Sequence, residues 1–188
     1  ESAARRGIAV RNTPNAFTDA VADLTMGFIL SFARQIPWAN EDIRAGLWEK
    51  KRPGVSLSES TLGIFGLGSI GRAVAKRAHA FGMNILGYDV MTLPKEMLED
   101  TGVEVVSLDR ALYESDFITL HCDLNPGSKY LIRDVQFDSM KPNAVIINTA
   151  RGPLIEEAAL IRALQNKKIA GAGLDVFEQE PLPHDSRL

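Results

Sequence analysis

The fold of this chain is decided by the stretch Thr61-Leu62-Gly63-Ile64-Phe65-Gly66-Leu67-Gly68-Ser69-Ile70-Gly71. It starts with a short run rich in apolar side chains, which predicts a buried strand. The run continues as G-x-G-x-x-G, and an amphipathic segment over residues 69–81 predicts a helix directly after it. In such a turn Gly66 permits the tight bend, Gly68 lets a phosphate group approach the backbone, and Gly71 lets helix and strand pack closely. The stretch therefore predicts a strand–turn–helix unit that binds a dinucleotide.

A second feature favours a dinucleotide over other nucleotides. The apolar run over residues 84–88 predicts the next strand, which ends at Asp89, 18 residues beyond Gly71. A carboxylate at that place can accept hydrogen bonds from ribose hydroxyl groups. The chain has no G-x-x-x-x-G-K-[ST] phosphate loop, so ATP or GTP chemistry has no support in the sequence.

Short apolar runs alternate with amphipathic stretches along the rest of the chain, which is typical of an α/β fold with a parallel sheet. Further strands are expected over residues 103–106, 117–121, 144–148 and 170–175. Further helices are expected over residues 95–100, 108–114, 134–140 and 156–165. The predicted fold class is α/β with a doubly wound parallel sheet, in one domain over residues 1–188.

The segment before the glycine motif predicts a strand, a turn and a long helix. Residues 7–12 predict the strand, and the turn over 12–15 follows because Pro14 keeps its neighbour out of the helical region. The helix is expected over residues 18–35, with Thr18 as its N-cap.

This helix is apolar nearly all round, so two interpretations stay open: a core helix, or a helix between the sheet and a partner subunit. Trp38 and Trp48 follow closely, and tryptophan is a residue that anchors interfaces.

Composition excludes several classes of protein. The 21 Lys and Arg against 24 Asp and Glu give a net charge of −3, which excludes a strongly basic nucleic-acid binder. The single cysteine, Cys122, excludes a disulfide framework and a cysteine-based zinc site, and no metal site is expected. The longest apolar-rich stretch, over residues 20–33, is too short to cross a bilayer and contains Asp23.

The chain has no visible signal peptide, and its one cysteine fits the reducing cytoplasm. It does not begin with Met, so it is expected to be part of a longer protein. This leaves a plastid or another organelle open.

Polar residues stand at two predicted strand ends in the second half, where an open α/β sheet places its ligands. Together with the glycine motif, they make the chain resemble the NAD-dependent D-2-hydroxyacid dehydrogenase family. The resemblance covers essentially the whole chain and implies a Rossmann-type NAD-binding domain. The residues that carry it are Asn12-Thr13-Pro14, Ala33-Arg34-Gln35-Ile36-Pro37, Gly66 to Gly71, Gly87-Tyr88-Asp89, Asp116 to His121, Asn148-Thr149-Ala150-Arg151-Gly152, Gly171 to Phe177 and Glu180-Pro181.

The resemblance implies two catalytic residues and a set that binds NAD. Arg151 would hold the substrate carboxylate, because a guanidinium fits a carboxylate with two parallel hydrogen bonds. Glu180 would orient a catalytic histidine and stabilise its protonated form. The implied cofactor-binding residues are Gly66, Gly68, Ser69, Ile70, Gly71, Asp89, Cys122, Thr149, Ala150, Arg151 and Asp175.

Within this set Ser69 and Ile70 would donate backbone N–H groups to the diphosphate. Thr149 and Ala150 would line the nicotinamide site, and Asp175 would bind the carboxamide. Cys122 would lie on the adenosine side, with a buried structural thiol as the alternative. Asp123 stands where many relatives have proline, which leaves the adenosine-side contacts open.

The family's catalytic histidine follows the Glu-Pro pair in a Thr-Pro-His context that this chain lacks. His79 is expected to be solvated, His121 structural, and His184 does not match the pattern. The histidine is therefore expected beyond Leu188, and a separate substrate-binding lobe outside this sequence.

The resemblance also implies a reaction: hydride transfer between NAD and a small D-2-hydroxy or 2-oxo acid. It is greatest to the branch of the family that oxidises 3-phosphoglycerate at the start of serine synthesis. A glyoxylate/hydroxypyruvate reductase is one alternative, and an NAD-responsive protein resembling transcriptional corepressors is another. The protein is expected to form a homodimer. It is not expected to bind nucleic acid or a membrane.

Overall fold

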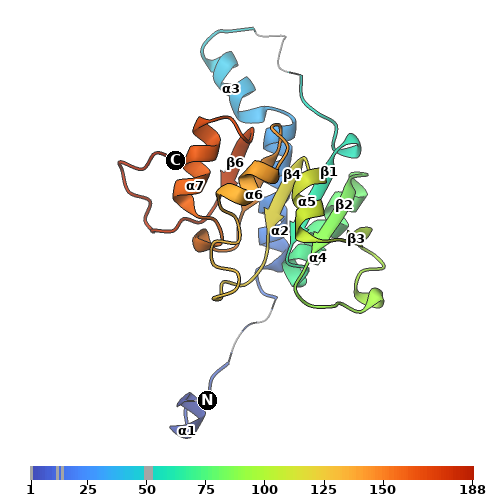
Figure 1. Cartoon of the computed structure of the whole chain (residues 1–188), viewed down its shortest axis with the longest axis vertical. Coiled ribbons are helices and arrows are strands. Elements are labelled where there is room, and N and C mark those ends of the chain that lie inside the picture. The colour runs from blue at the N-terminus through green and yellow to red at the C-terminus, as the bar shows by residue number, and fades with distance from the viewer. Residues whose placement is uncertain (1, 12, 14, 49–52) are drawn as a thin grey trace.

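Six parallel strands form one sheet in the order β3-β2-β1-β4-β5-β6 (Figure 1). The structure is a computed structural model that describes residues 2–11, 13, 15–48 and 53–188. The strands are β1 (Thr61–Phe65), β2 (Asn84–Tyr88), β3 (Val103–Val105), β4 (Phe117–Leu120), β5 (Val145–Asn148) and β6 (Gly171–Leu174). The predicted doubly wound parallel sheet is confirmed, since all five strand pairs are parallel.

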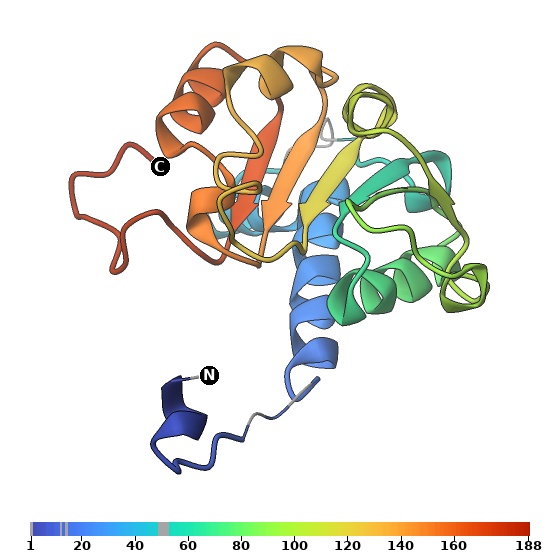
Figure 2. The same ribbon diagram turned by 60° about the horizontal axis from the view of Figure 1, so that its bottom comes forward.

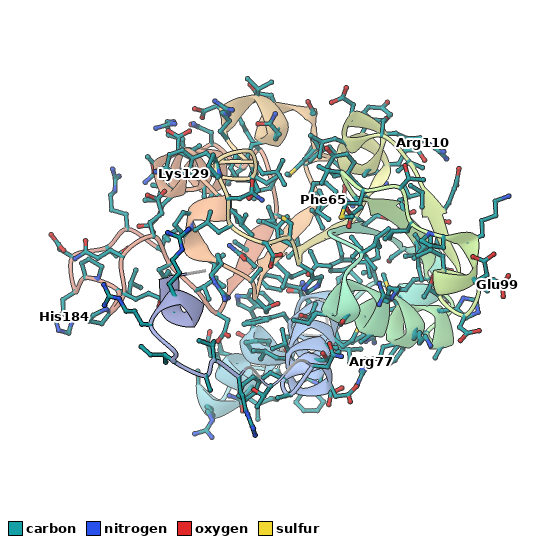
Figure 3. All side chains as sticks on the ribbon, turned by 90° about the horizontal axis from the view of Figure 1, so that it is seen from below. Phe65, Arg77, Glu99, Arg110, Lys129 and His184 are labelled. Carbon is teal, nitrogen blue, oxygen red and sulfur yellow. The ribbon has the colours of Figure 1, made fainter. Side chains whose placement is uncertain are left out.

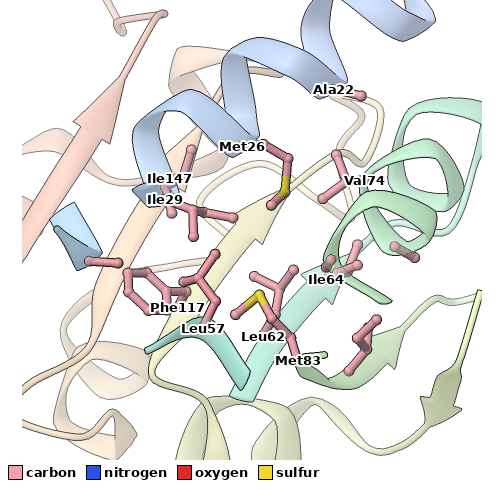
Figure 4. Close-up of a cluster of buried hydrophobic side chains, with 14 of the residues drawn as sticks. Ala22, Met26, Ile29, Leu57, Leu62, Ile64, Val74, Met83, Phe117 and Ile147 are labelled. Atoms are coloured by element: carbon pink, nitrogen blue, oxygen red, sulfur yellow. The ribbon is translucent and has the colours of Figure 1, made fainter. Parts of the chain in front are cut away.

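Helices cover both faces of the sheet. The described helices are α1 (Ser2–Arg5), which lies away from the sheet (Figure 1), α2 (Thr18–Ala33), α3 (Ile36–Arg44), α4 (Ser69–Ala80), α5 (Leu108–Glu114), α6 (Asp134–Ser139) and α7 (Glu157–Gln165). Short 3₁₀ turns are η1 (Leu57–Glu59), η2 (Lys95–Met97) and η3 (Gly152–Leu154). Because side chains alternate across a strand, β1 contributes Ile64 to one core and Phe65 to the other. The first core packs on α2 and α4 (Figures 2 and 4), and the second on α5, α6 and α7.

The order of the strands creates the place for a ligand. The chain builds outward from β1 to β2 and β3, then returns to the other side of β1 with β4. The connections after β1 and β4 therefore leave the sheet in opposite directions at its carboxyl edge. Open α/β sheets bind ligands at this switch point.

Several predicted boundaries are wrong near the amino terminus. Residues 7–11 form no strand; they lie away from the sheet (Figure 1), and Val10 is 75% exposed. A strand needs a neighbour to pair with, and none of the described strands lies beside this segment. Thr18 is the first helical residue and not the cap, since Phe17 occupies the N-cap position without a side-chain hydrogen bond. Asn12 and Pro14 of the predicted turn lie outside the described residues.

The remaining helices differ at their ends. The long helix stops at Ala33, and Gln35 adopts a left-handed conformation (φ 57°) before α3 begins. Residues 95–100 contain only the 3₁₀ turn η2. Phe81 follows α4 and is 45% exposed, although its position in the apolar pattern predicts burial.

The chain itself covers much of α2. Phe28 and Phe32 pack on Gly173 and Gly171 of β6, where an added Cβ would lie 2.9 and 2.6 Å from a phenylalanine ring atom. On another side Arg77 of α4 (Figure 3) binds two carboxylates of α2, Asp19 at 3.0 Å and Asp23 at 2.7 Å.

One run of exposed apolar side chains lies on α3 and the residues directly after it. Trp38 is not part of it, because its ring packs 5.4 Å from that of Phe32. The large apolar side chains exposed there are Ile36, Ile43, Leu47 and Trp48. No helix in the described part of the chain is long and apolar enough to cross a membrane.

Candidate functional site

The glycine turn lies between β1 and α4 at the switch point, and two of its glycines are required by the fold. Gly66 has a φ of +95°, and a Cβ there would lie 2.6 Å from the backbone nitrogen of Cys122. A Cβ on Gly71 would lie 2.0 Å from the carbonyl oxygen of Gly66. Gly68 differs, since a Cβ there meets nothing within 4 Å. The protein alone does not need a glycine at this position, and the space in front of it is open.

The amino end of α4 suits an anionic group. Gly68 is the N-cap and provides no side chain, and the first turn contains no acidic residue. The first N–H groups of a helix have no intrahelical partner and carry partial positive charge. Those of Ser69 and Ile70 stand beside the open space at Gly68, so the residues present fit a diphosphate.

Asp89 follows β2, and its carboxylate is bonded to the glycine turn. One carboxylate oxygen accepts a hydrogen bond from the Leu67 N–H at 2.7 Å, and the other from the Met91 N–H at 2.9 Å. The carboxylate is thus fixed at the end of β2, as its place in the sequence predicts. The next two residues, Val90 and Met91, are exposed and uncharged.

The end of β4 lies directly beside Gly66, at the backbone of His121 and Cys122. The His121 N–H donates to the Phe65 carbonyl at 2.7 Å, and its ring Nε2 lies 3.0 Å from the Thr119 hydroxyl. Burial lowers the pKa of His121 to about 4, so the ring is neutral at pH 7. Burial, with the charges of Asp89 and Asp123, raises the pKa of the Cys122 thiol to about 11. Both side chains are therefore uncharged at pH 7.

A compact turn follows β5 and presents Arg151. The buried Asn148 side chain donates to the Arg151 carbonyl at 2.9 Å and accepts from the Ala150 N–H at 3.1 Å. The Arg151 side chain is exposed and donates to the Ala150 carbonyl at 2.6 Å. Within the described part of the chain it forms no ion pair, so its charge is available to a ligand.

The segment after β6 packs against this turn. The Asp175 N–H donates to the Asn148 carbonyl at 3.0 Å, and a Cβ on Gly152 would lie 1.9 Å from the Phe177 carbonyl oxygen. Asp175 is exposed at the carboxyl end of β6. The sheet therefore brings Thr149, Ala150, Arg151 and Asp175 to one edge, which they share with the glycine turn.

Glu180 and the histidines are not assembled into a catalytic pair. The exposed Glu180 carboxylate accepts the Phe177 N–H at 3.0 Å, which closes a local turn. His79 is exposed on α4, and His184 is exposed on the tail (Figure 3). The structure thus leaves Glu180 without a histidine partner among the described residues.

Three supporting residues were not predicted from the sequence. Asn148 shapes the turn that presents Arg151, and Thr25 of α2 bonds to Thr149. Glu178 accepts the Glu157 N–H at 2.6 Å and thereby caps α7. Two of them left a signal in the sequence: Asn148 is the polar end of a predicted strand, and Thr25 is a polar residue within an apolar helix.

A hollow of about 570 Å³ lies at the opposite, amino edge of the sheet. Its charged side chains are already paired: Glu114 with Arg110, Lys141 with Asp116 and Asp138 with Lys168. It also lies away from the carboxyl strand ends, so it is not the predicted site. In the described ranges no group of three or more His, Cys, Asp or Glu is arranged to hold a metal ion.

The strand order, the glycine turn at the switch point and the acid after β2 define a dinucleotide-binding domain of the Rossmann type. Residues 26–188 match the family described as D-isomer specific 2-hydroxyacid dehydrogenase, NAD binding domain, and the chain belongs to this family. Members of the family are NAD-dependent oxidoreductases that act on CH–OH groups, so the predicted family and cofactor are confirmed.

Two curated relatives illustrate the similarity. The chain is 50% identical to a D-3-phosphoglycerate dehydrogenase of Methanocaldococcus jannaschii, over all of this chain and 36% of the relative. It is 46% identical to a glyoxylate reductase of Thermococcus litoralis, over 96% of this chain and 57% of the relative. The chain thus spans between about a third and three fifths of the length of these relatives.

Solved structures agree with the fold. A glyoxylate reductase from Paecilomyes thermophila superposes with a TM-score of 0.87 at 42% identity, over 98% of this chain and 56% of that one. A D-lactate dehydrogenase from Aquifex aeolicus, complexed with NAD and lactic acid, gives a TM-score of 0.87 at 34% identity, over 95% of this chain and 54% of that one.

Proposed function

We propose that the chain is the NAD-binding domain of an oxidoreductase that transfers hydride between NAD and a D-2-hydroxy acid, with 3-phosphoglycerate as the acid. The observation that carries the proposal is Arg151, which forms no ion pair with any described residue and lies at the same sheet edge as the open glycine turn. A fixed positive charge beside a dinucleotide groove suits a carboxylate substrate. The 50% identity to a D-3-phosphoglycerate dehydrogenase supports the choice of acid and a place in serine biosynthesis.

Each groove residue then has a defined task. The Ser69 and Ile70 N–H groups bind the diphosphate, and the Asp89 carboxylate accepts hydrogen bonds from the adenosine ribose hydroxyls. Cys122 lies beside the adenosine, and the Asp175 carboxylate accepts a hydrogen bond from the carboxamide. Bound NAD supplies the hydride acceptor, while Arg151 orients the acid by its carboxylate.

The whole protein contributes the rest of the active site. We infer that residues 1–188 are the NAD-binding domain and that a separate lobe, built from other sequence, binds the substrate. The catalytic histidine that Glu180 orients comes from outside these 188 residues. The cytoplasm is the proposed compartment, on the basis of the single cysteine.

We also propose a homodimer. The apolar residues Ile36, Ile43, Leu47 and Trp48 are each at least 52% exposed and lie close together in the sequence. Exposed apolar patches of this kind favour association.

Two alternatives remain for the whole protein. The 46% identity to a glyoxylate reductase favours a glyoxylate/hydroxypyruvate reductase as the second candidate. An NAD-responsive corepressor-like protein would bind the cofactor without turnover.

Titration calorimetry of the chain with NAD tests the cofactor site, and turnover of the full-length protein with 3-phosphoglycerate and with glyoxylate tests the reaction. Arg151→Ala should abolish turnover and leave NAD binding within about threefold, whereas Arg44→Ala, at an exposed arginine of α3, should change neither. Faster turnover with glyoxylate would replace the first candidate by the second. Binding without turnover of any 2-hydroxy or 2-oxo acid would favour the corepressor-like class.

A further inference from the structure

Two buried hydroxyl groups meet where α2 crosses the carboxyl end of β5. Thr25 is 0% exposed and Thr149 is 8% exposed, and their Oγ1 atoms lie 3.0 Å apart. The Thr25 hydroxyl also lies 2.9 Å from the Val21 carbonyl oxygen, to which it donates. The two residues come from distant parts of the sequence, so this contact exists only in the folded chain.

The contacts determine which hydroxyl donates to which. Each hydroxyl has one proton, and a buried proton needs an acceptor. Both protons are used within the described chain only if Thr25 donates to the Val21 carbonyl and Thr149 donates to Thr25. In this arrangement the Thr149 oxygen keeps its lone pairs and can accept a hydrogen bond from a further donor.

The neighbouring backbone is already occupied. The Ala150 N–H is bound by Asn148, and the Ala150 carbonyl accepts from Arg151. The Thr149 oxygen is therefore an acceptor that this turn can still offer to a ligand. The carboxamide end of a nicotinamide has N–H donors that suit it.

We propose that Thr25 is a positioning residue for the nicotinamide end of the cofactor site. It takes up the Thr149 proton and so holds the Thr149 side chain with its lone pairs toward the ligand. This inference rests on the proposed role of Thr149 in the nicotinamide site, and it adds a residue of α2 that touches neither cofactor nor substrate.

The test compares two ligands that differ only at the nicotinamide. NAD and ADP-ribose are titrated calorimetrically into the chain carrying Thr25→Val, Thr25→Ser or no change. Thr25→Val removes the acceptor but keeps the shape, and Thr25→Ser keeps the hydroxyl. Thr101→Val is the matched control, since Thr101 is also 0% exposed and bonds its own turn, at the Leu98 carbonyl, before β3.

NAD affinity should fall about three- to tenfold in Thr25→Val, the range expected for one hydrogen bond. ADP-ribose affinity should stay within about twofold, and Thr25→Ser should bind both ligands like the unchanged chain. Thr101→Val should lower the melting temperature without changing the ratio of the two affinities.

Two failures can be told apart. If the unchanged chain binds neither ligand, the proposed function fails. If it binds both and Thr25→Val lowers both affinities equally, or lowers neither, or if Thr25→Ser behaves like Thr25→Val, the positioning role is refuted. Should Thr25→Val not fold, Thr149→Val keeps the inference testable: it must weaken NAD but not ADP-ribose, and an unchanged ratio overturns the inference.

Discussion

Gly68 and Gly71 belong to one motif, yet alanine at each should act on a different property of the protein. At Gly68 a Cβ meets nothing within 4 Å. The backbone there is extended, with φ −65° and ψ −165°, so alanine causes no clash. Alanine is a poorer N-cap than glycine, but its lower conformational entropy in the unfolded chain offsets this. The free energy of unfolding should therefore change by no more than about 1 kcal/mol. For a chain of this size that corresponds to a melting-temperature shift of less than about 2–4 °C.

At Gly71 the same substitution should destabilise the fold. Its Cβ would lie 2.0 Å from the Gly66 carbonyl oxygen and 3.0 Å from the Gly66 carbonyl carbon. Backbone atoms cannot rotate away as a side chain can, so α4 has to move from β1, at a cost of about 1–3 kcal/mol. Helix propensity alone predicts that the substitution stabilises the fold, because alanine favours a helix interior by about 1 kcal/mol over glycine.

Thermal unfolding and NAD titration of both variants separate the two effects. Gly68→Ala should keep its melting temperature and lose NAD affinity at least about tenfold, because the methyl group occupies the space in front of the helix terminus. Gly71→Ala should melt several degrees lower. An NAD affinity unchanged in Gly68→Ala would contradict the proposed role of Gly68, and a raised melting temperature in Gly71→Ala would contradict the proposed clash at Gly71.

Three further predictions concern other groups. Asp89→Asn keeps an acceptor for the Leu67 N–H but removes the charge that repels a 2′-phosphate, so the ratio of NAD affinity to NADP affinity should fall about tenfold or more in paired titrations. Equal binding of NAD and NADP by the unchanged chain would contradict this prediction. Cys122, with a pKa of about 11, should react with iodoacetamide at pH 8 about a hundredfold more slowly than a free thiol, as followed by mass spectrometry; a rate like that of free cysteine is the contrary result. His121 has a pKa of about 4 in the folded chain against 6.5 in the unfolded chain, so the unfolded chain binds the proton first and the free energy of unfolding should drop as the pH falls from 6.5 to 4. The urea midpoint of His121→Asn should depend less on pH over this window than that of the unchanged chain, and an equal dependence would exclude His121 as the cause.

The parts of the protein that depend on local spacing could be predicted from the amino-acid sequence. The glycine motif, the strands of the sheet and Asp89 were predicted within a residue or two, because strand periodicity and turn chemistry are properties of neighbouring residues. The edge of the sheet that carries Arg151 and Asp175 also followed from the pattern, since parallel strands align their carboxyl ends.

The contacts between distant segments could be seen only in the folded chain. The structure showed that none of the described strands pairs with residues 7–11, and that Trp38 packs on Phe32 while Trp48 stays 77% exposed. Likewise the bond between Thr25 and Thr149 joins residues separated by most of the chain. Such contacts depend on how α2 crosses the sheet, which is set by the packing of Phe28 and Phe32 on two glycines of β6 and not by any local pattern.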